Sequence, residues 1–317
     1  MDIQKRNSQI IVVTIAILSA VILAGLAYWW HVRLEPTVST TANPTPSVSV
    51  GSWKTLLATF SPGGSDRSDA NDREVEYKLF SVQAPNLAEE QLGSVASNIF
   101  VNTFQYMDGN VYFVNGDGEL AMYNLATKKS ERVALPDIKP VFGFLDVHSV
   151  YDFGFVDTMK LVYLQGACTD GSACSLKEYD FTTKKATSII DHIEKKFSIN
   201  GETTIKIQGA DGTDNSVRLI RTRNTADGGF ADLISVALDT HKDTVLQTVN
   251  FTTGSKNPDA DALFGKTFLC GDVSGTQELA DVTGQDDNEM QITAGVKPDG
   301  LVKKYHPTYF VGCVMPK

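Results

Sequence analysis

Acidic residues gather in short clusters that could bind a metal cation. The densest is Asp286, Asp287 and Glu289, and smaller groups include Asp117 and Asp259. Carboxylates close together supply the oxygen ligands that calcium takes in proteins. None of the clusters has the twelve-residue calcium-loop pattern, with its central Gly and closing Glu. The sequence therefore offers Asp286, Asp287 and Glu289 as the best calcium candidates. The alternative is that all these clusters are solvated turns.

Four cysteines, Cys168, Cys174, Cys270 and Cys313, also carry chemistry of their own. An even number of cysteines in an exported chain predicts disulfides. The polar, turn-forming residues between Cys168 and Cys174 favour a local bond, which leaves Cys270 to pair with Cys313. A zinc site is the alternative, but no two cysteines have the C-x-x-C spacing that such sites use.

The spacing of serine and histidine gives no support for nucleophilic catalysis. The chain has no Gly-x-Ser-x-Gly turn, and the five histidines are scattered without the spacing of a helical metal site. Arg218, Arg221 and Arg223 are expected to pair with neighbouring acids rather than to bind an anion. We predict no catalytic residue and no cofactor other than calcium, and expect binding rather than catalysis.

The elements that must position these residues recur along the chain. Stretches beginning at Tyr123, Tyr179 and Val236 share one pattern: two apolar residues on one face of a strand, a polar turn, and a second apolar strand. The steps between them are 56 and 57 residues. A fixed period of this size predicts one stacked supersecondary unit, because a single unit cannot bury its apolar face alone.

The first repeat, Asn110–Val133, resembles a blade of the β-propeller repeat proteins, of the TolB-like and dipeptidyl-peptidase-like kinds. The match consists of a strand, the Gly turn Asn115-Gly-Asp-Gly, and the pattern Leu120-Ala-Met-Tyr-Asn-Leu before the next turn. Lys or His stands where the usual blade has a turn Gly. Such blades carry many functions, so the resemblance implies the fold and no particular activity.

The implied fold class is all-β: a propeller-like array of four-stranded antiparallel meanders, with three clear units plus a degenerate one after Phe251. Most such families have six or more units. The chain is therefore expected to form a four-unit ring, or an incomplete ring that another chain completes.

Insertions between the second and third strands distinguish the repeats. The first repeat has a tight turn there, whereas the second inserts Gly166–Cys174 and the third inserts Thr222–Phe230. Loops elaborated on one face of a repeat fold often form its binding surface, although neutral variation gives the same pattern. The residues expected on this binding face are Thr169, Asp170, Ser172, Asn224, Asp227 and Phe230.

The amino-terminal region predicts a membrane anchor. Ile10–Trp30 carries no charge, and at about 1.5 Å per residue it spans roughly 30 Å, the thickness of a bilayer core. Residues 1–35 are thus expected to be a short cytoplasmic tail and transmembrane helix, because basic Lys5 and Arg6 precede the span. A cleaved signal peptide is the alternative.

A spacer is predicted to separate the anchor from the β domain. Residues 36–73 form a Ser/Thr/Pro-rich stalk, in which Trp53, Leu56 and Phe60 mark the apolar stripe of a short amphipathic helix. Residues 74–317 then form the extracytoplasmic β domain.

The net charge and the predicted membrane topology limit the functions that the chain can have. The formal net charge of −10 repels nucleic acid. We expect a single-pass plasma-membrane protein whose outer domain is a binding module for a cell-envelope protein or glycan. The alternatives are a hydrolase of envelope glycan or peptide, and a structural subunit of a surface assembly in which open strand edges pair between chains.

Overall fold

Almost all of the described structure is β-strand. The computed structural model describes residues 54–60, 74–83, 88–98, 103–140, 147–168, 172–199, 203–225, 228–252, 267–269, 277–281, 290–294, 301–305 and 308–314. Residues 49–317 form one compact unit. The one described helix is the single turn α2 (Ile193–Lys196). The all-β prediction is therefore confirmed.

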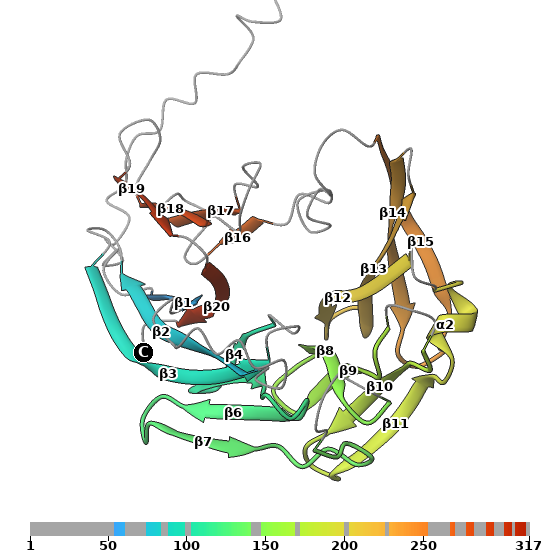
Figure 1. Cartoon of the computed structure of the whole chain (residues 1–317), viewed down its shortest axis with the longest axis horizontal. Helices are drawn as coiled ribbons and strands as arrows, with labels where there is room; N and C mark the ends of the chain where they lie inside the picture. Colours follow the sequence, from blue (N-terminus) through green and yellow to red (C-terminus); the bar gives the residue numbers. More distant parts are fainter. Residues whose placement is uncertain are drawn as a thin grey trace, which may run out of the picture. The chain divides into compact units, whose positions relative to one another are not determined.

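The strands form five antiparallel sheets of four strands each (Figure 1). Sheet 1 contains β20 (Thr308–Val314), β1 (Lys54–Phe60), β2 (Glu74–Gln83) and β3 (Ala88–Asn98). Sheet 2 contains β4 (Gln105–Met107), β5 (Asn110–Val114), β6 (Leu120–Asn124) and β7 (Lys129–Arg132). Sheet 3 contains β8 (Val150–Phe155), β9 (Lys160–Gln165), β10 (Ser175–Asp180) and β11 (Lys185–Ile190). Sheet 4 contains β12 (Thr203–Asp211), β13 (Ser216–Thr225), β14 (Gly228–Ala237) and β15 (Asp243–Thr252). Sheet 5 contains β16 (Thr267–Leu269), β17 (Gln277–Asp281), β18 (Met290–Ala294) and β19 (Leu301–Tyr305).

The repeated hairpin occupies the same place in sheets 2, 3 and 4. Tyr123, Tyr179 and Val236 lie on the third strand of their sheets, and all three are buried. Their partners on the second strand are also equivalent, since Tyr123 pairs with Val111, Tyr179 with Leu161, and Val236 with Val217. The predicted repeat is confirmed.

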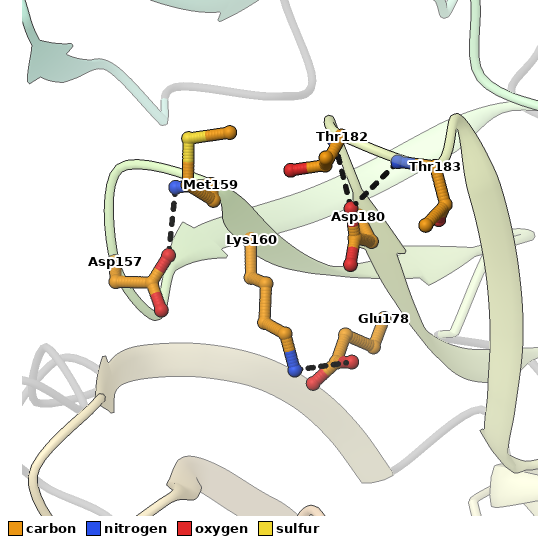
Figure 2. A network of polar contacts seen from close by, with 7 residues as sticks. All are labelled: Asp157, Met159, Lys160, Glu178, Asp180, Thr182 and Thr183. Carbon is orange, nitrogen blue, oxygen red and sulfur yellow. Dashed lines mark hydrogen bonds and ion pairs between the residues drawn. The ribbon is translucent and has the colours of Figure 1, made fainter.

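In sheets 2 and 3 the turn after the third strand is held by a polar side chain of that strand. In sheet 3 the Asp180 carboxylate accepts hydrogen bonds from the amides of Thr182 and Thr183, at 2.7 and 2.9 Å (Figure 2). In sheet 2 the Asn124 side chain accepts from the amides of Ala126 and Thr127 in the same way, at 3.0 and 2.8 Å. Asn and Asp favour turns because they can hydrogen-bond the backbone two residues ahead.

The predicted helix before residue 60 is wrong: Lys54–Phe60 is strand β1, paired with β2 and β20. Leu56, Leu57 and Ala58 are all buried, so apolar residues occupy both faces of this strand. A strand covered on both faces has a continuous apolar run instead of alternation, and such a run also satisfies the spacing of a helix. The β domain consequently begins before residue 74.

The sequence pattern also understated the number of sheets. Sheet 5 is the degenerate unit expected after Phe251, but sheet 1 was not predicted as a unit because its strands come from both ends of the described chain. Within it, Lys54 pairs with Val314 and Thr59 with Thr308. This pairing covers an edge of β1 that would otherwise be open.

Apolar side chains fill the spaces between successive sheets. One cluster joins sheets 1 and 2 and includes Tyr77 and Phe113; a second joins sheets 2 and 3 and includes Leu120 and Phe153. A third joins sheets 3 and 4 and includes Leu164. The repeats are therefore stacked through shared cores, as expected for units that cannot bury an apolar face alone.

The predicted anchor, Ile10–Trp30, lies outside the described residues. None of the helices in the part of the chain that the structure describes has the length and apolar character of a membrane span.

Candidate functional site

The first inserted connection is held by a disulfide. Cys168 and Cys174 are bonded to each other, as predicted, and both are buried in the core between sheets 3 and 4. Cys313 is also disulfide-bonded. Cys270 lies outside the described residues, so its pairing with Cys313 stays a prediction. The bond between Cys168 and Cys174 fixes both ends of the short loop that contains Thr169, Asp170 and Ser172.

Helix α2 forms hydrogen bonds with Cys174, at the end of this loop. The backbone amide of Cys174 donates to the Glu194 carboxylate at 3.0 Å, and the Cys174 carbonyl accepts from the amide of Ile193 at 3.0 Å. The other Glu194 oxygen lies 3.0 Å from Nδ1 of His192. Burial by itself raises the pKa of Glu194, but the Cys174 amide, its own amide and His192 together lower that pKa below its usual value.

The same segment also contacts the second predicted region. The carbonyl of Phe197, the residue that follows α2, accepts a hydrogen bond from the Arg221 guanidinium on β13 at 3.2 Å. Lys196 forms an ion pair with Asp243 at the start of β15, at 2.6 Å. Residues 192–197 therefore link the disulfide loop of sheet 3 to the strands of sheet 4.

Arg221 is fixed by a buried carboxylate on the neighbouring strand. Its Nε donates to Asp232 at 3.0 Å and its Nη2 donates to the same oxygen, while the Thr248 hydroxyl donates to the other Asp232 oxygen at 2.6 Å. The guanidinium lies 5.4 Å from the centre of the Phe230 ring, in reach of a cation–π contact. The prediction that Arg221 pairs with a neighbouring acid is confirmed.

The predicted loop at 222–230 is mostly strand. Residues up to Thr225 continue β13, and Gly228 begins β14, so that Arg223 pairs with Phe230 and Asn224 with Gly229. The sequence suggested an insertion because these strands are longer than those of the other repeats. The extra residues of sheet 4 therefore lengthen the hairpin of β13 and β14 and do not form a separate loop.

Residues 192–197 connect the two regions in which the binding face was predicted. We give the name disulfide–hairpin surface to Ser172, His192, Arg221 and Phe230, whose side chains are at least partly exposed. Ser172 and Phe230 are predicted members that the structure describes. The side chain of Asn224 and all of Thr169, Asp170 and Asp227 lie outside the described residues and stay predictions.

Sequence reasoning missed His192, Glu194 and Asp232. Two of them act through a partner that is brought close only by the fold: Glu194 reaches Cys174, and Asp232 lies opposite Arg221 in the strand register. His192 in turn contacts Glu194. For Asp232 a signal existed, since it is the single charged residue of a largely apolar strand.

A third buried carboxylate, Asp152, joins three sheets. Asp152 of β8 accepts from the Thr103 hydroxyl at 2.6 Å and from the amide of Ile207 on β12 at 2.6 Å. The Gln105 amide of β4 donates to the Phe153 carbonyl and accepts from the Phe155 amide, both at 3.0 Å. Burial raises the pKa of Asp152, and the hydrogen bonds from Thr103 and Ile207 oppose that rise. The arrangement connects strands of sheets 2, 3 and 4 where they meet.

The predicted calcium ligands Asp286, Asp287 and Glu289 lie outside the described residues. Among the residues that the structure does describe, no group of three or more His, Cys, Asp or Glu side chains could hold a metal ion. The calcium site therefore stays a prediction.

Consecutive four-stranded antiparallel meanders stacked through apolar cores are a β-propeller-like fold, in agreement with the resemblance seen in the first repeat. No family model matches the chain, and no curated protein matches it.

Solved structures give likenesses of fold only. TolB from Acinetobacter baumannii is 10% identical with a TM-score of 0.38, over 80% of this chain and 53% of that one. Dipeptidyl peptidase 4 from Porphyromonas gingivalis is 11% identical with a TM-score of 0.37, over 83% and 41%. The amino-terminal domain of Nup159 is 10% identical with a TM-score of 0.35, over 76% and 60%. The chain thus spans between 41% and 60% of these structures.

Proposed function

We propose that this protein is an interaction module of the cell envelope that binds its partner, a protein or glycan, through the disulfide–hairpin surface. The observation that carries the proposal is the link through residues 192–197, which bonds to Cys174 at the end of the disulfide-bonded loop and to Arg221 in the first strand of the long hairpin. Rigid loops and strand ends held on a scaffold are the usual means by which repeat folds present binding groups.

The surface offers chemistry suited to either partner class. Phe230 and the Arg221 guanidinium present an aromatic ring beside a cation, a combination enriched at protein interfaces. Ser172 and His192 add partly exposed hydrogen-bonding groups. The buried carboxylates Asp152, Asp232 and Glu194 are occupied by backbone and side-chain donors, which gives them a positioning role.

We further propose that residues 1–35 anchor the module in the plasma membrane, with residues 74–317 outside the cytoplasm. The uncharged span Ile10–Trp30 supports an anchor, and the disulfide between Cys168 and Cys174 supports an oxidising compartment. Amino-terminal sequencing of the mature protein tests this proposal. A terminus at Tyr28 or beyond would show a cleaved signal peptide instead.

The binding proposal is tested by photo-crosslinking in the cells that make the protein. A photoreactive amino acid replaces Ser172 in one variant and Thr187, an exposed residue of β11, in a matched control. We expect a discrete adduct from position 172 and none from position 187. Equal labelling at both positions, or none at either, would contradict the proposed surface.

A further inference from the structure

Strand β15 forms an open, uncharged edge of sheet 4. Among the described strands it pairs with β14 and is last in the order of its sheet. From Thr244 to Thr252 it contains no charged residue. Val245 and Leu246 are 51% and 52% exposed, and they are two of the few large apolar side chains that the described part of the chain leaves exposed. An edge of this kind is a template for pairing with another strand.

The outer strand of sheet 1 shows how an edge in this protein is protected. Strand β3 carries Glu89 and Glu90, and the Lys128 ammonium donates to the Leu92 carbonyl at 2.7 Å. The Tyr123 hydroxyl donates to the same carbonyl at 3.3 Å. Charges and side-chain bonds to edge carbonyls both discourage the addition of a further strand.

The outer strands of the other sheets are short, charged or both. Strand β7 has four residues, of which Lys129, Glu131 and Arg132 are charged. Strand β11 has six residues and begins with Lys185, and β19 has five with two lysines. In contrast to these strands, β15 is ten residues long, and its one charged residue, Asp243, is already paired with Lys196. A bulge at Leu246 interrupts its pairing with β14 but leaves Gln247–Thr252 regular.

We propose that β15 pairs antiparallel with β15 of a second copy of this chain and joins two copies of sheet 4 into one continuous sheet. Pairing across a two-fold axis uses the same edge on both copies, which is the geometry of a closed dimer. Any register that sets 244–252 against 244–252 places no charged residue opposite another. A charged foreign strand would leave its charges beside Val245 and Leu246 without a partner, so a second copy fits this edge better.

The test is sedimentation of the full chain in mild detergent across about two decades of concentration. The variant carries Leu246→Lys and Gln247→Lys, which place like charges on both copies of the edge. The matched control carries Thr187→Lys on the edge of β11. We expect the wild type and the control to form dimers, and we expect the double variant to dimerise about tenfold more weakly or worse.

Hydrogen exchange keeps the test decisive if the double variant does not fold. In the wild type, amide protection of Gln247–Thr252 should rise with protein concentration, while protection of β11 should not change. A wild type that stays monomeric throughout overturns the proposal, as does a double variant that dimerises like the wild type. Binding of an extended foreign peptide by a monomeric wild type would likewise show that the occupant is another protein. The dimer does not depend on the disulfide–hairpin surface, so the two proposals can fail separately.

Discussion

Lys128 and Lys184 adopt the same left-handed backbone conformation, with φ of 58° and 54°, at equivalent positions of two successive repeats. His241 does so in the third repeat, with φ of 55°. These are the positions where the blades that the first repeat resembles usually have Gly, which adopts positive φ without steric cost. The turn geometry has therefore been kept, although the residue that usually permits it is absent.

Replacing Lys184 with Gly should stabilise the protein by about 0.5–1 kcal/mol, because the left-handed conformation is unfavourable for a residue with a Cβ. Lys185→Gly is the matched control, and it should destabilise because Lys185 lies in strand β11. Urea unfolding of both variants measures the difference. A Lys184→Gly variant less stable than the wild type would be incompatible with this reasoning.

Replacing Asp152 with Ala should destabilise the protein by about 2–4 kcal/mol, since the buried Ile207 amide and Thr103 hydroxyl would lose their acceptor. Thr103→Val removes one donor and should cost about 1 kcal/mol. Thermal unfolding of the two variants gives both values. Equal, small effects would mean that this carboxylate does not hold the three sheets together.

Removing Arg221 should be costly because it leaves Asp232 buried without a cationic partner. Arg221→Ala should lower the free energy of unfolding by about 3–5 kcal/mol. Arg221→Lys should restore little, because an ammonium reproduces neither the two bonds to one carboxylate oxygen nor the contact of the guanidinium with the Phe230 ring. If Arg221→Lys has the stability of the wild type, the interaction with Asp232 depends on charge alone, which would contradict this prediction.

The lowered pKa of Glu194 predicts an acid-sensitive clamp. Its stabilising contribution is fully present above the unfolded pKa, near 4.5, and is lost as the pH falls through the lower folded value. In Glu194→Gln the side-chain carbonyl can still accept from Cys174, but it does not titrate in this range. Unfolding between neutral pH and about pH 3.5 should therefore lose less stability in the variant than in the wild type. Identical pH profiles of the variant and the wild type would show that Glu194 does not contribute to the pH dependence of stability.

The repeats were predictable because their signals are local. Alternating apolar residues and a polar turn specify a hairpin within about a dozen residues, and the local disulfide needs only a short turn between Cys168 and Cys174. Strand β1 was not predictable, because a strand buried on both faces has no alternation to detect. Its partner β20 comes from the other end of the chain, which no local pattern can indicate.

Most of the candidate site could not be predicted either, because its residues make contacts with residues that are distant in the sequence. The two lengthened regions could be found from the spacing of the repeats, but the link between them could not. Glu194 contacts a residue 20 positions away, and Asp152 contacts one 55 positions away. Such contacts depend on the register and stacking of sheets, which the sequence of a single chain does not reveal.

The central claim is that the disulfide loop and the hairpin form one binding surface. The most direct measurement places a photoreactive residue at Ser172 in one variant and at Asn224 in another, and identifies the crosslinked molecules by mass spectrometry. We predict that both positions capture the same envelope protein or glycan, and that adding Arg221→Ala reduces both adducts. Capture of different molecules at the two positions, or adducts that Arg221→Ala leaves unchanged, would contradict the claim.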